Sequence, residues 1–196
     1  MTKASATRLT ILQKAFELIY QKGYQTTSID EIIATTKVTK GAFFYHFKTK
    51  DEMALAIINE IVKPAMENAF LKPLETEKNP IKTIYKMFND LLFNNPFLQL
   101  EHGCPAGNLA QEMTPWNEEF SKALSSLTKK WQTALKNSIE MGKQNGIIRK
   151  KVNASQVAYF IMSGYWGIRV FGKIYNNTES YRAYLQELKI YLNTLK

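Results

Sequence analysis

The sequence predicts an all-α protein of about nine helices, in which an N-terminal three-helix domain precedes a C-terminal helical bundle. All six prolines lie between residues 64 and 115, so shorter helices should fill the middle third and longer ones should flank it. Strand signals are missing, because valines are few and no Asn-Gly or Asp-Gly separates alternating apolar runs. Apolar residues recur instead at helical intervals along most of the chain.

The first helix is predicted where apolar residues recur at helical spacing through residues 9–19, and Gly23 ends it. After it, Thr27 or Ser28 can cap a second, short helix, because a side-chain oxygen there can accept from free backbone amides. The two acidic residues in the first turn of this helix suit the positive end of its dipole.

Thr39 can cap a third short helix that continues to about residue 46, and Thr49 can cap a fourth that starts near Lys50. Beyond it, the apolar pattern predicts helices near 80–95, 103–113, 117–143, 154–173 and 178–194. Gln144-Asn145-Gly146 follows a long helical pattern, so it is interpreted as a helix C-terminus with glycine.

The chain has 196 residues and is 45% hydrophobic, which is enough to bury a substantial core. Its formal net charge of +9 favours a polyanionic partner, with nucleic acid ahead of an anionic membrane surface. Residues 1–50 hold eight basic and three acidic side chains, and therefore 8 − 3 = +5 of that charge. The excess charge is concentrated around the first three predicted helices.

The single cysteine, Cys104, cannot form an internal disulfide, which favours a reducing compartment. The first ten residues are polar and lead into no apolar signal sequence. The most apolar stretch, 157–172, is shorter than the roughly 20 residues that a membrane-spanning helix needs. We therefore expect a cytoplasmic protein without contact to a membrane.

Two short helices that are joined by a turn and packed on a longer helix form a helix-turn-helix. In its second short helix, Phe43 and Phe47 share one face, because they are four residues apart. The opposite face presents residues that suit a DNA groove: Lys40, Gly41, Phe44, Tyr45 and His46. Lysine can reach phosphates or guanine edges, glycine lets the backbone approach, and aromatic rings can contact thymine methyl groups.

Residues 26–53, TTSIDEIIATTKVTKGAFFYHFKTKDEM, resemble the signature of the TetR (tetracycline repressor) family of bacterial transcription regulators. The stretch GCPAGNLAQEM at 103–113 is similar to one branch of that family. The resemblance implies a TetR-like fold, with a DNA-binding domain at 1–48 and a ligand-sensing and dimerisation domain at 49–196. It implies base or phosphate contacts from Thr27, Thr39, Lys40, Gly41, Tyr45, His46 and Lys50, and a weaker one from Phe44, where members usually carry tyrosine.

The second part of the chain is rich in aromatic and methionine residues, most of which should be core and some of which could line an effector pocket. The candidate pocket residues are Phe88, Cys104, Asn108, Met113, Trp116, Trp131, Tyr165 and Trp166. A thiol at a helix N-terminus can have a lowered pKa, so a repressor that senses electrophiles through Cys104 is the alternative. A metal site of Cys104 with His102 and Glu101 is disfavoured, because no fourth ligand is visible.

Near the C-terminus, apolar residues recur with alternating spacings of four and three, as in a helix that packs along a partner helix. The candidate interface residues are Tyr181, Leu185, Leu188 and Leu192, with Gly164 and Gly167 in the preceding helix. The family resemblance implies a symmetric dimer through these last two helices, and packing within one chain is the alternative.

These observations predict a transcriptional regulator that a small apolar or amphipathic effector releases from a pseudo-palindromic double-stranded operator. The homodimer would present two recognition helices, and no cofactor is expected. An enzyme is disfavoured, because the sequence holds no Ser-His-Asp, metal or phosphate-loop pattern. A purely architectural DNA binder stays open, although the C-terminal part is larger than DNA binding needs.

Overall fold

The computed structural model describes residues 2–76 and 78–196, and these residues form helices, turns and loops with no strand. This confirms the all-α class. The chain divides into two compact units: unit 1 consists of Met1–Pro64 with Pro105–Ser125, and unit 2 of Ala65–Cys104 with Ser126–Lys196. The predicted boundary at 48/49 therefore differs from this division, in which unit 1 extends to Pro64 and includes a second segment.

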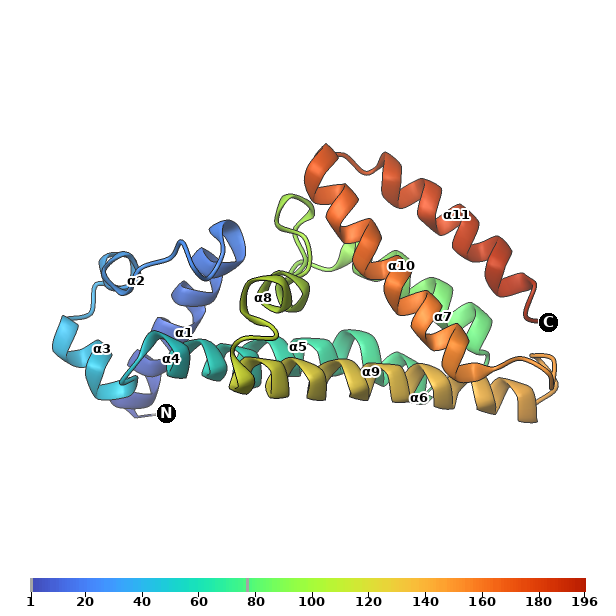
Figure 1. Ribbon diagram of the computed structural model, residues 1–196, viewed down its shortest axis with the longest axis horizontal. Coiled ribbons are helices and arrows are strands. Elements are labelled where there is room, and N and C mark those ends of the chain that lie inside the picture. Colours follow the sequence, from blue (N-terminus) through green and yellow to red (C-terminus); the bar gives the residue numbers. More distant parts are fainter. Residues whose placement is uncertain (1, 77) are drawn as a thin grey trace. The chain divides into compact units, whose positions relative to one another are not determined.

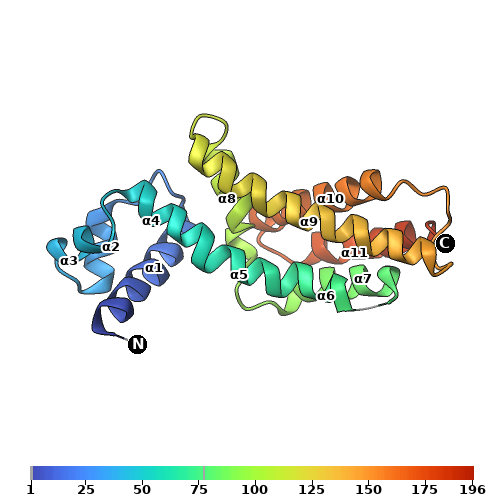
Figure 2. The ribbon, with the colours of Figure 1, turned by 90° about the horizontal axis from the view of Figure 1, so that it is seen from below.

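Unit 1 begins with four helices, which Figure 1 labels along the chain: α1 (Lys3–Lys22), α2 (Ile29–Thr36), α3 (Lys40–His46) and α4 (Lys50–Ile57). α1 packs against both α2 and α4, and α3 contacts α1 and α2, so that the four form one cluster (Figure 2). Ile11, Leu12, Ile32 and Phe43 are fully buried in its core. α8 (Pro105–Met113) and the start of α9 (Glu118–Gln144) complete the unit.

The helix termini of unit 1 lie where the sequence predicts them. Gly23 follows α1 with a φ of 98°, a conformation that favours glycine. Ser28 and Glu31 form a capping box at the start of α2, and the nearby Lys22 ammonium and Ser28 lower the pKa of Glu31 to about 2. Thr39 caps α3 by accepting from the amide of Ala42 at 3.1 Å. These local contacts fix where each short helix begins.

Two prolines of the middle third do not end a helix as predicted. Pro64 lies in α5 (Lys63–Met66) and Pro73 in α6 (Lys72–Thr76), and helix continues through residues 50–76. Each proline follows a π-helical segment, η1 (Ile58–Val62) or η2 (Glu67–Leu71). A π turn is wider than an α turn, so it can move the preceding carbonyls away from a proline ring that would otherwise clash with them.

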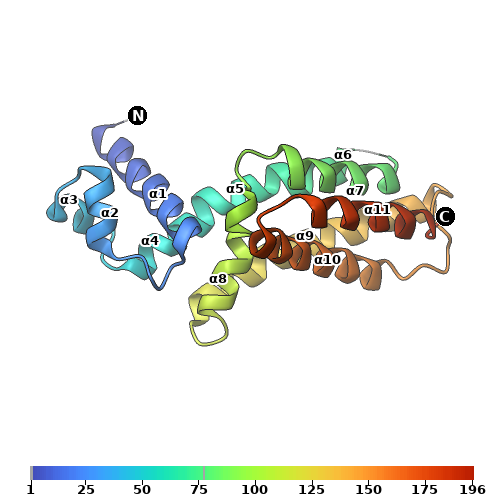
Figure 3. The same cartoon turned by 90° about the horizontal axis from the view of Figure 1, so that it is seen from above.

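Unit 2 also contains α7 (Pro80–Asn89), η3 (Asp90–Asn94), η4 (Leu100–His102), the rest of α9, α10 (Ala154–Tyr175) and α11 (Glu179–Asn193). α11 packs against both α7 and α10, and Figure 3 shows it between them. The core of unit 2 contains an aromatic cluster of Phe70, Phe88, Trp131 and Tyr165, whose ring centroids lie 5.0 to 6.3 Å apart. Edge-to-face pairs dominate this cluster, as is favourable for aromatic rings.

Arg169 of α10 is completely buried in unit 2. Its guanidinium donates to the Tyr181 hydroxyl at 2.8 Å, to the Gln99 carbonyl oxygen at 2.7 Å and to the Gly103 carbonyl oxygen. A buried cation needs such partners, since an uncompensated one would be costly. The contacts hold the loop around η4 against α10 and α11. Within residues 2–76 and 78–196, no helix has both the length and the apolar character needed to cross a bilayer.

Candidate nucleic-acid interface

α3 has the two faces that its sequence predicts. Phe43 and Phe47 are buried against the rest of unit 1, and their ring centroids lie 6.1 Å apart. On the other face, the side chain of Lys40 is 68% exposed and Tyr45 is 73% exposed. An aromatic residue that stands free in solvent on a folded helix is available for a partner surface. Thr39 and Gly41, at the start of the helix, are exposed as well.

The aromatic residues at the end of α3 support one another. The rings of Tyr45 and His46 meet edge to face with centroids 5.0 Å apart, which restricts how the exposed tyrosine can turn. Phe44 is half-buried and contacts the buried Phe43 edge to face at 5.4 Å. Tyr45 is therefore exposed beside a ring that it contacts, whereas Phe44 is half-buried against Phe43.

The basic side chains around α3 are free to reorient toward an anion. Lys40 forms an exposed ion pair with Asp30 at 3.3 Å, and such surface pairs contribute little stability. Lys48, just after α3, is exposed and donates to the Phe44 carbonyl oxygen at 3.1 Å. Lys48 was not predicted to be a site residue, although its place directly after the basic, aromatic face of α3 indicates that it could reach a phosphate.

The structure places Thr27 and Lys50 away from the exposed face of α3. Thr27 is only 1% exposed, and its hydroxyl donates to the Gly23 carbonyl oxygen at 2.7 Å. The ammonium of Lys50 donates to the carbonyl oxygens of Tyr24 and Thr27 at 2.9 and 3.0 Å and lies 4.2 Å from the centre of the Tyr24 ring. Partial burial lowers the pKa of Lys50. Both side chains therefore bind the α1–α2 turn. They are less exposed to solvent than Lys40 and Tyr45 on the exposed face of α3.

Two acidic side chains complete this environment, and the sequence did not indicate that either contacts the α1–α2 turn. Asp51 accepts a hydrogen bond from the Tyr24 hydroxyl, and burial together with this hydrogen bond raises the pKa of Tyr24. Glu112 of α8 accepts from the backbone amides of Tyr24 and Gln25. No sequence signal could have found Glu112, because it lies 88 residues from Tyr24 along the chain.

The eight candidate effector residues are divided between the two units. Phe88, Trp131 and Tyr165 lie together in the aromatic cluster, but in ring-to-ring contact. Cys104, which is partly exposed, and Trp166 also belong to unit 2. Asn108, Met113 and Trp116 belong to unit 1, where Met113 is buried and Trp116 is 69% exposed.

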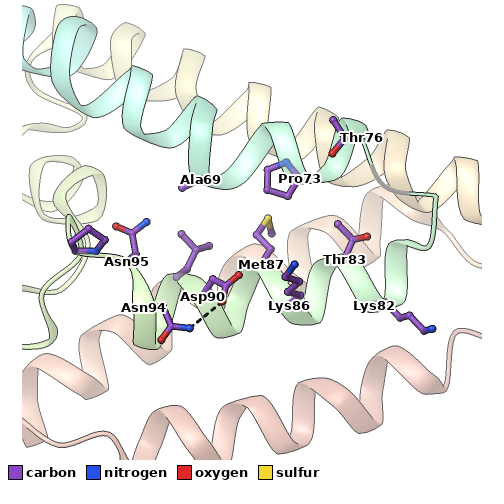
Figure 4. Close-up of a pocket in the computed structure, with 12 residues that line it drawn as sticks. Ala69, Pro73, Thr76, Lys82, Thr83, Lys86, Met87, Asp90, Asn94 and Asn95 are labelled. Atoms are coloured by element: carbon purple, nitrogen blue, oxygen red, sulfur yellow. Dashed lines mark hydrogen bonds between the residues drawn. The ribbon is translucent and has the colours of Figure 1, made fainter.

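Unit 2 has a groove that none of those eight residues lines. It has a volume of about 560 Å³ and lies between the 69–76 helical stretch and the α7–η3 stretch (Figure 4). Its wall includes apolar side chains of Pro73, Met87 and Leu91, and polar ones of Lys86 and Asp90. Small-molecule sites commonly have 300 to 1,000 Å³ and mix apolar walls with a few polar groups, and this groove has both properties.

The predicted interface seam is buried within the subunit. Tyr181, Leu185, Leu188 and Leu192 of α11 all face the core, which that helix shares with α7 and α10. A β-carbon on Gly164 would lie 2.9 Å from the Tyr184 ring, so this glycine permits packing inside unit 2, whereas Gly167 has open space. The exposed large apolar side chains of α10 and α11 are different ones: Tyr159, Phe160, Val170, Phe171, Ile174, Tyr175 and Ile190.

Comparisons with known proteins cover both parts of the chain. Residues 11–57 match the family model described as bacterial regulatory proteins, tetR family. Residues 82–188 match the model of a tetracyclin repressor-like C-terminal domain.

Among curated proteins, the chain is 34% identical over 121 residues to an uncharacterized HTH-type transcriptional regulator of Lactococcus lactis, and the match covers 62% of each chain. It is 22% identical over 182 residues to the HTH-type transcriptional repressor DhaR of a Mycobacterium species, covering 89% of this chain and 86% of DhaR. The crystal structure of a TetR transcriptional regulator from Chloroflexus aurantiacus shares the fold, with a TM-score of 0.87, 24% identity and coverage of 98% and 97%.

The contacts of Lys50 generate the first prediction. Lys50→Met should lower the free energy of unfolding by about 1 to 3 kcal/mol, because two carbonyl oxygens of the α1–α2 turn lose a charged donor. Lys48→Met is the matched control, since its exposed side chain donates to a carbonyl oxygen near the end of α3, and it should change stability by less than about 0.5 kcal/mol. Urea unfolding followed by circular dichroism measures both, and equal effects would contradict a structural role for Lys50.

Proposed function

Because the chain belongs to the TetR family of bacterial regulatory proteins and is a helix-turn-helix transcriptional regulator, we propose that it represses transcription from a pseudo-palindromic operator. The observation that carries the proposal is the exposed face of α3, with Lys40 and Tyr45 in solvent above a buried pair of phenylalanines. The name of one relative, DhaR, describes a repressor, which supports this direction of regulation. We place this activity in the cytoplasm, where bacterial DNA lies.

In the proposed complex, α3 enters the major groove. Lys40 reaches a phosphate or a guanine edge once its weak pair with Asp30 opens. Tyr45 and His46 contact the groove wall, and Gly41 lets the backbone approach. Thr39 contributes its exposed hydroxyl, and Phe44 adds an apolar edge. Thr27 and Lys50 act indirectly, through the turn that carries α2 and α3.

We propose that the second recognition helix comes from a second copy of this chain. The exposed apolar face of α10, with Ile190 of α11, is large and rich in aromatic residues, which is typical of an interface between subunits. A two-fold dimer would present two copies of α3 to two half-sites of an operator. Gly167, which has open space on its side of α10, would allow close approach there.

We propose the groove of unit 2 as the effector site (Figure 4). Its apolar wall would take the apolar part of an amphipathic molecule, while Lys86, Asp90 and Asn94 would take polar groups. Effector binding would shift the population of dimers away from the spacing of the two recognition helices that fits the operator. A coupling of about 1 to 3 kcal/mol would change operator affinity about 5- to 150-fold.

The DNA interface predicts the effect of two substitutions. Tyr45→Ala and Lys40→Ala should each weaken binding to the protein's own upstream operator by about 10- to 100-fold, because each dimer loses a groove contact twice. Lys122→Ala is the control, since Lys122 is an exposed lysine of unit 1 that pairs with Glu118 outside the helix-turn-helix. Electrophoretic mobility shift at fixed salt measures the affinities. Unchanged binding by both α3 variants would refute α3 as the recognition helix.

The interface predicts a change of oligomeric state. Ile174→Glu places a charge on the exposed apolar face and should yield folded monomers in sedimentation velocity. Leu188→Glu places the same charge in the core of unit 2 and should instead cause loss of helix content in circular dichroism. A persistent Ile174→Glu dimer would place the interface elsewhere.

The groove predicts which substitution removes an effector response. A compound that raises the melting temperature in a screen and dissociates the operator should lose both effects in Ala69→Trp, because the indole fills the groove. At a concentration of 100 Kd, such a compound stabilises the wild type by about 2.7 kcal/mol. Cys104→Ser should respond as the wild type does. If only Cys104→Ser lost the response, the thiol-sensing alternative would be correct.

A further inference from the structure

The turn between α1 and α2 is held by a carboxylate from a distant part of the chain. The backbone N–H of Tyr24 donates to Oε1 of Glu112 at 3.1 Å, and that of Gln25 donates to Oε2 at 2.8 Å. The side-chain amide of Gln25 also donates to the sulfur of the neighbouring Met113 at 3.3 Å. Both oxygens of one carboxylate therefore accept from two successive backbone amides, and hydrogen bonds to an ionised acceptor are stronger than neutral ones.

The backbone of the turn is shaped to admit this carboxylate. Gly23 has a φ of 98°, and a β-carbon built on it would lie 3.0 and 3.2 Å from the two oxygens of Glu112. Such a distance is too short for comfortable packing, so only glycine combines this conformation with this approach. The end of α1 and the position of Glu112 are thus matched to each other.

The carbonyl oxygens of the turn are bound by a cation. Lys50 donates to the carbonyl oxygens of Tyr24 and Thr27, while Glu112 accepts from the amides of Tyr24 and Gln25. Asp51 adds a second link to the 105–125 segment, since it accepts from the Tyr24 hydroxyl and, at 3.2 Å, from the side-chain amide of Asn117. The turn leads directly to Ser28, the N-cap of α2, so these contacts fix where α2 starts.

We propose that Glu112 is a positioning residue for operator binding: its carboxylate sets the orientation in which α2 and α3 leave α1, although it belongs to α8. This inference rests on the proposed DNA-binding function and adds a residue that lies far outside the helix-turn-helix. The two recognition helices of a dimer must fit two half-sites at the same time. A loosened turn in each subunit therefore weakens specific binding at both half-sites. Nonspecific binding depends mainly on phosphate contacts and tolerates such loosening.

The test uses Glu112→Gln in the full-length protein. Glutamine keeps the size of the side chain but replaces one acceptor oxygen by an NH₂ donor, which would face a backbone N–H. The operator is a duplex that the wild type selects from a random pool. At a temperature where circular dichroism shows both proteins folded, we expect operator affinity to fall at least about 10-fold, with unchanged affinity for random duplex. Amide hydrogen exchange at Tyr24 and Gln25 should become faster.

Glu118→Gln is the matched control, because Glu118 is an exposed glutamate of unit 1 that pairs with Lys122, and it should bind the operator like the wild type. If Glu112→Gln does not fold, Glu112→Asp replaces it, since the shorter side chain keeps the charge and withdraws the carboxylate from the turn. Operator affinity within twofold of the wild type, increased affinity, or an equal loss of specific and nonspecific binding would each overturn the proposal. A wild type that selects no sequence would instead refute the DNA-binding function.

Discussion

The arrangement of unit 1 depends on the α1–α2 turn, whose backbone groups are bound by two side chains of opposite charge. The ammonium of Lys50 binds its carbonyl oxygens and the carboxylate of Glu112 binds its amides. A turn exposes both kinds of backbone group, and each needs a partner where water is excluded. Charged side chains bind both kinds of group in this turn and so restrain its conformation. The position of α3, and so of Tyr45, follows from it.

Local features of the fold could be predicted from the sequence because they depend on near neighbours. Ser28, Thr39 and Thr49 cap helices through contacts three residues away, and Gly23 ends α1 by its own conformation. The two faces of α3 follow from helical spacing alone. Pro64 and Pro73 were mispredicted, because the sequence does not show that a π turn before each proline would let the helix continue.

Contacts between distant segments could not be predicted in the same way. Lys50 begins α4 as expected, but its partners are carbonyl oxygens more than 20 residues earlier, and these remove it from the solvent-facing side. The apolar seam of α11 was correctly seen as needing a partner helix, yet periodicity does not say whether that helix belongs to the same subunit. α7 and α10 meet that need within unit 2, which leaves the exposed aromatic side chains of α10 for another surface.

Unit 1 is built from two separate segments of the chain, which affects how binding at one place can influence another. The chain passes between the two units at Pro64–Ala65, Cys104–Pro105 and Ser125–Ser126, so unit 1 receives three covalent connections. Two of these bound the 105–125 segment, which contributes Glu112 and Asn117 to the α1–α2 turn and to Asp51. A unit that ended at residue 48 would have a single covalent connection, and Glu112, Asn117 and Asp51 would all lie outside it. Because coupling between two ligands is reciprocal, any effector whose binding depended on the 105–125 segment would bind with a different affinity when DNA held the helix-turn-helix in place.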